Sequence, residues 1–238
     1  MKRKERLLVA LDVDDRDRAR ELVKCLAGLV GGFKVGMRLY YRVGPEILSY
    51  LRGKAPVIFA DLKLHDIPST VAGGVRALVA QGATMVNVHA AGGRLMMRAA
   101  RDAAAEEAAR TGIERPKVLA VTVLTSIDEE ALRADLGVNN SVEKQVVSWA
   151  HMAKDCGLDG VVVSPREAYS VRKACDKGFL IITPGVRPEG SSLEDQKRVM
   201  TPAEAVKAGA DYIVVGRPVI AAADPVEALT RILSSLEA

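Results

Sequence analysis

Residues 57–70 read VIFADLKLHDIPST and join an apolar run to a helix start. The first half is rich in apolar and β-branched residues, which is typical of a parallel strand covered on both faces. Pro68 marks the helix, because proline is favoured at the first helical position. The stretch therefore predicts a strand that runs directly into a helix, the repeating unit of α/β proteins.

The same strand-to-helix pattern recurs along the chain. We expect eight strands, at residues 7–12, 32–36, 57–63, 85–89, 117–122, 160–164, 179–183 and 212–216. Eight such units in 238 residues predict a (β/α)8 TIM barrel and a single domain spanning residues 1–238. A doubly wound open sheet is the competing fold, but it often has a glycine-rich first turn, which residues 12–15 lack.

Helices are predicted from apolar stripes and from capping residues. Residues 15–30 and 224–236 carry apolar side chains at helical spacing. Residues 164–167 (SPRE) and 201–204 (TPAE) are interpreted as capping boxes, and Asp224 precedes a proline. The charged segment 128–136 is expected to form an extra helix over the barrel mouth.

Composition excludes several classes of protein. The chain has 34 Lys and Arg against 30 Asp and Glu, so its net charge of +4 is too small to indicate a nucleic-acid-binding surface. Three scattered cysteines do not form a disulfide scaffold, and the longest uncharged stretch contains polar residues and glycines. We therefore expect a soluble, cytoplasmic protein that does not bind membranes.

Charged side chains gather at the predicted strand ends, where barrel enzymes place their active sites. In residues 57–70, Asp61 and Lys63 are two apart and should share one face of the strand, with Asp66 just beyond. An ammonium held between carboxylates suits a general acid that delivers a proton to carbon. The alternative is an inert salt bridge at the barrel rim.

A second constellation follows the last two strands. Gly216 lets backbone N–H groups approach an anion closely, and Arg217 offers a bidentate clamp. Arg187, after the seventh strand, would face them. Phosphate sites recur at these loops of the barrel fold, although a turn glycine and a surface arginine remain the plainer interpretation.

These residues resemble the orotidine 5′-monophosphate decarboxylases, most closely the shorter bacterial type. Residues 58–70 fit the family signature at every position. Further matching motifs lie at residues 11–12 (LD), 33–36 (FKVG), 88–93 (VHAAGG), 124–126 (LTS), 183–187 (TPGVR), 195–196 (DQ) and 215–217 (VGR).

The resemblance implies an enzyme that converts orotidine monophosphate to uridine monophosphate in pyrimidine synthesis, without metal or cofactor. It implies that Lys63 protonates the C6 carbanion and that Asp61 lies against the substrate's carboxylate. Asp66 would reach the site of the partner subunit in a homodimer.

The resemblance also implies a set of substrate contacts. These are Asp12, Lys34 and Thr70 for the ribose, Thr125 and Ser126 for the pyrimidine ring, and Arg187, Gln196, Gly216 and Arg217 for the phosphate. Thr70 would come from the partner subunit.

Two other functions stay open at this point. A Mg²⁺-dependent sugar-phosphate decarboxylase or aldolase of the same superfamily shares the Asp-x-Lys-x-x-Asp core, but those relatives carry a glutamate ligand where this chain has Lys34. A non-catalytic nucleotide-binding barrel would not call for a lysine between carboxylates. The three histidines have no spacing that suggests a metal site.

Overall fold

The computed structural model describes residues 3–187 and 200–236. Within them, eight parallel strands close into a barrel in sequence order, with β8 paired to β1. The strands are β1 (Leu7–Ala10), β2 (Gly32–Gly36), β3 (Val57–Leu64), β4 (Met85–His89), β5 (Lys117–Val121), β6 (Gly160–Val162), β7 (Leu180–Pro184) and β8 (Tyr212–Val215). Every predicted strand is present, and the predicted TIM barrel is confirmed.

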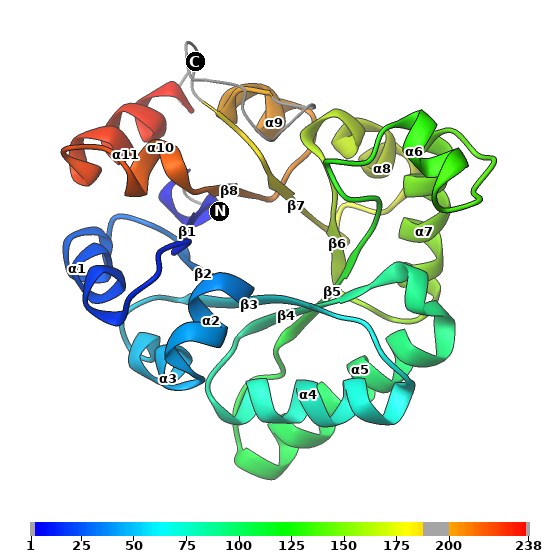
Figure 1. The fold of residues 1–238 in the computed structure, drawn as a ribbon, viewed down its shortest axis with the longest axis horizontal. Helices are drawn as coiled ribbons and strands as arrows, with labels where there is room; N and C mark the ends of the chain where they lie inside the picture. Colours follow the sequence, from blue (N-terminus) through cyan, green and yellow to red (C-terminus); the bar gives the residue numbers. More distant parts are fainter. Residues whose placement is uncertain (1–2, 188–199, 237–238) are drawn as a thin grey trace.

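Helices surround the ring of strands (Figure 1). The α-helices are α1 (Arg16–Leu26), α2 (Met37–Val43), α3 (Glu46–Leu51), α4 (Pro68–Ala80), α5 (Gly93–Thr111), α6 (Glu129–Ala134), α7 (Val142–Asp155), α8 (Ala168–Ala174), α9 (Pro202–Lys207), α10 (Arg217–Ile220) and α11 (Pro225–Ser235). Short 3-10 helices span Arg3–Arg6, Ala90–Gly92 and Pro165–Glu167. No helix in the described ranges is long and apolar enough to cross a membrane.

Two of the three predicted helix starts form as expected. Thr201 and Glu204 make a reciprocal capping box, and the Asp224 carboxylate accepts from two backbone N–H groups of α11. The capping box predicted at Ser164 is wrong. The Ser164 hydroxyl accepts from the N–H of Arg166, because the chain first makes a 3-10 turn and α8 starts only at Ala168.

Strand alternation separates two apolar layers. Leu7 and Val9 of β1 point outward against the helices, whereas Leu8 and Ala10 point inward. The inner layer also contains Phe59 of β3. These side chains fill the barrel below its carboxyl end, so a ligand can enter only above them.

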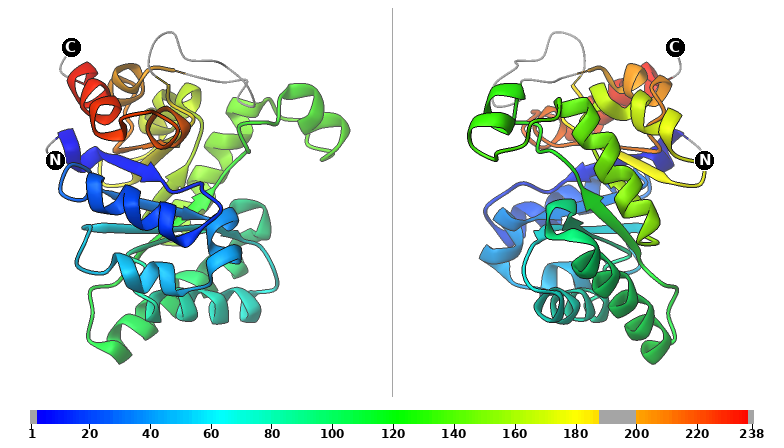
Figure 2. Two further views of the ribbon diagram at one scale, coloured as in Figure 1. Left: turned by 60° about the vertical axis from the view of Figure 1, so that its left-hand side comes forward. Right: turned by 90° about the vertical axis from the view of Figure 1, so that its right-hand side faces the viewer.

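The predicted helix in the charged segment after β5 is present as α6. With its flanking segments it projects outward from the barrel (Figure 2). None of its residues lines the cavity at the barrel mouth. The sequence analysis placed this helix over the barrel mouth, whereas α6 lies beside the mouth.

Candidate active site

A cavity of about 280 Å³ opens at the carboxyl ends of the strands. One wall is charged and comes from β1 to β3: Asp12, Lys34, Asp61 and Lys63. The facing wall is apolar and comes from the ends of β5 and β6: Val121, Val123, Leu124, Val162 and Val163. The third wall follows β7 and β8 and contains Arg187, Gly216 and Arg217. The cavity thus has separate ionic, apolar and cationic sides.

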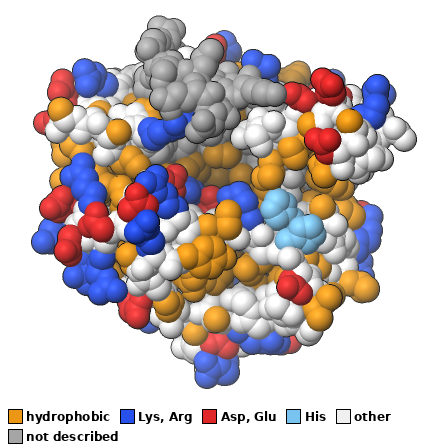
Figure 3. Space-filling model, viewed as in Figure 1, with side chains coloured by type: hydrophobic (Ala, Val, Ile, Leu, Met, Phe, Trp, Pro, Cys, Tyr) orange, Lys and Arg blue, Asp and Glu red, His pale blue; other side chains and the backbone are white. Residues whose placement is uncertain are grey.

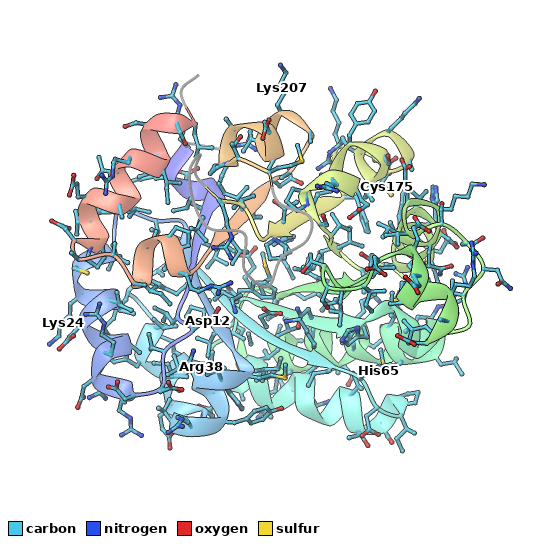
Figure 4. All side chains as sticks on the ribbon, turned by 45° about the horizontal axis from the view of Figure 1, so that its top comes forward. Asp12, Lys24, Arg38, His65, Cys175 and Lys207 are labelled. Atoms are coloured by element: carbon cyan, nitrogen blue, oxygen red, sulfur yellow. The ribbon has the colours of Figure 1, made fainter. Side chains whose placement is uncertain are left out.

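Four side chains of the charged wall form a row of alternating sign. The Lys34 ammonium lies 3.0 Å from Asp12 Oδ1 and 3.3 Å from Asp61 Oδ2. The other oxygen of Asp61 lies 2.7 Å from Lys63 Nζ. In Figure 4 Asp12 lies beside the first strands of the barrel, inside the layer of outer helices. Each ammonium is therefore held against a carboxylate.

Burial makes this row electrostatically strong. Lys34 and Asp61 are both 8% exposed. Burial by itself raises the pKa of Asp61, but the Lys34 and Lys63 ammonium groups outweigh it and hold the pKa below the usual value. Burial likewise opposes the charge on Lys34, and Asp61 and Asp12 together raise its pKa. Both groups are charged at neutral pH.

Lys63 occupies an irregular segment of β3. The pairing of β3 with β4 passes from Ala60–Val86 to Leu64–Val88, so four steps on β3 match two on β4. Within this bulge Lys63 has a φ of 52°, the positive-φ region that non-glycine residues rarely adopt. Lys63 and Asp61 do meet, as expected from their spacing, but across a bulge rather than along a regular strand.

Asn87 of β4 connects the backbone of Lys63 to the side chain of Asp61. Its Oδ1 accepts from the backbone N–H of Lys63 at 2.8 Å, and its Nδ2 donates to Asp61 Oδ1 at 2.7 Å. The sequence analysis missed this residue. The sequence did contain a signal: Asn87 is an amide flanked by apolar residues in the strand at residues 85–89.

The cationic wall suits an anion. Arg187 is 8% exposed, and its Nε has no hydrogen-bond partner in the described part of the chain. At Gly216 an added Cβ would meet only Ala10 Cβ at 3.5 Å and Asp12 Oδ2 at 3.7 Å. These are ordinary van der Waals separations, so the protein itself does not crowd the Gly216 backbone.

Most of the predicted site residues surround this one cavity. They are Asp12, Lys34, Asp61, Lys63, Thr125, Arg187, Gly216 and Arg217. Asp66, Thr70 and Ser126 are exposed and are not among the cavity residues. Gln196 lies outside the described residues.

The histidines do not line the cavity either. His65 and His89 lie with their rings 5.3 Å apart, beside the end of β4. Burial, reinforced by the neighbouring His65 and Lys63, lowers the pKa of His89, so its imidazole is neutral at neutral pH. Residues 3–187 and 200–236 contain no cluster of three or more potential metal ligands among His, Cys, Asp and Glu.

Comparison with known proteins gives one consistent family. Residues 5–232 match the model of the orotidine 5′-phosphate decarboxylase / HUMPS family. The chain is 51% identical to an orotidine 5′-phosphate decarboxylase of Moorella thermoacetica over 237 residues, covering 100% of this chain and 94% of the relative. It is 48% identical to that of Syntrophomonas wolfei, covering 100% of both.

A solved structure agrees with the sequence relatives. The crystal structure of orotidine 5′-phosphate decarboxylase from Lactobacillus acidophilus superposes with a TM-score of 0.85 at 38% identity. The match covers 98% of this chain and 99% of that one.

Proposed function

This chain belongs to the orotidine 5′-phosphate decarboxylase / HUMPS family and is a carboxy-lyase of pyrimidine biosynthesis that acts on orotidine 5′-monophosphate. From this premise we propose a role in the reaction for each predicted site residue. The observation that carries the proposal is the Lys63 ammonium, 2.7 Å from a buried carboxylate in a cavity with an apolar wall.

Lys63 is the proton donor. The bond between C6 and the carboxylate breaks, its electron pair stays on C6, and carbon dioxide leaves. The ammonium then gives its proton to C6, which forms the new C–H bond and leaves Lys63 neutral. Before that transfer the fixed positive charge stabilises the developing carbanion, because it is already in place and needs no reorganisation.

Asp61 acts on the carboxylate that leaves. Two like charges about 4 Å apart repel by about 4 kcal/mol at an effective dielectric of 20. Because Lys34 and Lys63 keep Asp61 charged, a substrate carboxylate beside it meets this repulsion in the bound state. Loss of carbon dioxide relieves it, while Asp61 keeps the Lys63 ammonium aimed at C6.

The remaining predicted site residues hold the rest of the nucleotide. Asp12, Lys34 and Thr70 bind the ribose, Thr125 and Ser126 the pyrimidine, and Arg187, Gln196, Gly216 and Arg217 the phosphate. The uncrowded backbone at Gly216 supports the phosphate assignment. So does the Nε of the buried Arg187, which has no hydrogen-bond partner within residues 3–187 and 200–236. Binding energy from this remote group contributes to catalysis by fixing the reacting end in place.

The partner subunit supplies Asp66 and Thr70 in a homodimer. Both residues are exposed and away from the cavity of their own chain. Next to them Ile67 is 64% exposed, and hydrophobic side chains gather over α2 in Figure 3. An apolar surface beside the site fits a second copy that covers it.

A Mg²⁺-dependent sugar-phosphate enzyme is disfavoured by Lys34. Its ammonium already neutralises Asp12 and Asp61 at 3.0 and 3.3 Å, where such an enzyme would need carboxylates free for the cation. A non-catalytic nucleotide-binding barrel is disfavoured by Lys63, whose charge adds nothing to holding a phosphate on the separate wall that follows β7 and β8.

The assay follows the loss of the orotate chromophore with orotidine monophosphate, with and without a chelator. We expect turnover that the chelator leaves unchanged, whereas Asp61→Asn lowers kcat. Strict dependence on Mg²⁺, or an Asp61→Asn variant as active as the parent, would contradict the assignment.

The shared site is tested by mixing two inactive variants, Lys63→Ala and Asp66→Asn. In a hybrid dimer one site carries both defects and the other carries neither. Random mixing in equal amounts therefore restores about a quarter of the parent activity. The absence of recovery, with subunit exchange verified by mass-tagged chains, would show that each site is built from one chain.

A further inference from the structure

Lys63 needs support that the strand ladder does not give it. A φ of 52° places this non-glycine residue in the strained left-handed region of the backbone. It also lies between the rungs Ala60–Val86 and Leu64–Val88, where β3 and β4 are out of register. A backbone N–H in such a bulge loses its regular partner, so something else must hold this conformation.

The Asn87 side chain takes that place. It lies in the middle of β4, is 1% exposed, and accepts from the Lys63 N–H with its Oδ1. Its Nδ2 donates to Asp61 Oδ1, the oxygen that also accepts from Lys63 Nζ. One rigid amide thus fixes the backbone of the lysine and the orientation of its carboxylate partner.

We propose that Asn87 is a positioning residue for decarboxylation, which acts by holding Lys63 in its left-handed conformation and by presenting Asp61 Oδ1 to the ammonium. Asn87 is not among the residues lining the cavity and acts only through Lys63 and Asp61. The inference rests on the proposed function, because it presupposes that Lys63 is the proton donor.

The alternative is an amide that merely fills and satisfies the core. The two roles differ in what they affect. A structural amide contributes to stability alone, whereas a positioning amide affects kcat more than KM, because the ribose and phosphate contacts lie elsewhere. A small misplacement of a reacting group can cost about 100-fold in rate.

The first test replaces the amide with an apolar side chain of similar size, Asn87→Leu. We expect kcat to fall by about 100-fold while KM changes less than about 3-fold. Thr122→Val is the matched control, since Thr122 is 2% exposed and its hydroxyl donates to Val162 O, with no hydrogen bond to Lys63 or Asp61. This control should keep kcat within about 3-fold of the parent.

The second test, Asn87→Asp, keeps the acceptor for the Lys63 N–H and makes the donor to Asp61 depend on pH. The introduced carboxyl would contact Asp61 and the backbone of Lys63 on β3. The other charged or titratable groups of this network are Lys34 of β2 and Asp12 beyond β1, which form the ion pairs that extend from Asp61, and His89 and His65, whose rings lie together beside the end of β4. Protonated, it donates to Asp61 as the amide does. Ionised, it faces a second carboxylate. The ratio of its kcat to that of the parent should therefore rise as pH falls from 8 to 5.

The outcomes separate the inference from the proposed function. Parent turnover that Lys63→Ala abolishes, combined with a kcat of Asn87→Leu within 3-fold of the parent, would overturn the role of Asn87 alone. A loss in Thr122→Val as large as in Asn87→Leu would overturn it too, as would a pH-independent ratio for Asn87→Asp. If Asn87→Leu does not fold, the pH series decides. Full activity in Lys63→Ala would instead refute the proposed function.

Discussion

Replacing Lys34 with methionine tests whether the buried charge row is held together as its geometry indicates. The Lys34–Asp61 separation of 3.3 Å corresponds to about 5 kcal/mol of attraction at an effective dielectric of 20. The variant loses this attraction but no longer buries an ammonium, and Lys63 still contacts Asp61. We therefore expect the free energy of unfolding to fall by about 3 kcal/mol. This is the lower end of the loss that follows when one partner of a buried ion pair is removed. Thermal unfolding should shift down by roughly 6–12 °C.

The pH dependence of this loss gives a second check. In the parent, the pKa of Asp61 is lower in the folded state than in the unfolded state. This difference stabilises the folded state at pH values above the ordinary carboxyl pKa, and the stabilisation is lost as the pH falls through the folded-state pKa. Without Lys34 the pKa of Asp61 rises, so protonation relieves the buried charge at mildly acidic pH. The stability difference between parent and Lys34→Met should thus shrink as pH falls from 8 toward 4.

The matched control is Lys154→Met, which removes an ammonium 2.7 Å from Asp176 at the surface. This pair is closer than Lys34 and Asp61, but solvent screens it, so the unfolding temperature should hardly change. The reasoning is refuted if Lys34→Met is no less stable than Lys154→Met, or if its deficit does not depend on pH.

Three further substitutions separate binding, geometry and stability. Gly216→Ala should raise KM at least about 10-fold, because the added methyl group would occupy space beside the backbone proposed to hold the phosphate. An unchanged KM would contradict the phosphate assignment. Gly36→Ala places a Cβ 2.9 Å from Lys34 Nζ and 3.1 Å from Asp12 Oδ1. Because these two side chains must move, kcat/KM should fall about 10-fold. Kinetics equal to the parent would show that the two side chains adjust freely. Arg172→Met removes an ion pair to Asp211 at 2.5 Å and hydrogen bonds to the carbonyls of Asp176, Phe179 and Gly209. Denaturant unfolding should show a loss of about 2–4 kcal/mol with kcat unchanged, and a changed kcat would link this distant network to the site.

The barrel was predictable because each strand carries its own signal. Buried parallel strands are apolar on both faces, and the strand at residues 85–89 ends where expected. Local chemistry also predicted the helix starts at Thr201 and Asp224. At Ser164 the same pattern failed, since a 3-10 turn and a capped α-helix begin with the same residues.

The site was predictable only in part. Charged residues at strand ends had to converge once the strands formed a barrel, which brought Asp12, Lys34 and Lys63 together. The bulge at Lys63 depends on the register between β3 and β4, and no local pattern encodes it. Asn87 was missed for the same reason, because its partners are 24 and 26 residues away.

The most direct test of the central claim compares Lys63→Ala with the parent in two measurements, turnover of orotidine monophosphate and equilibrium binding of uridine monophosphate. If Lys63 delivers the proton to C6, kcat falls by at least about 1,000-fold while the dissociation constant of the product changes less than about 10-fold, because the phosphate and ribose contacts remain. Turnover by Lys63→Ala at the parent's rate would contradict the account.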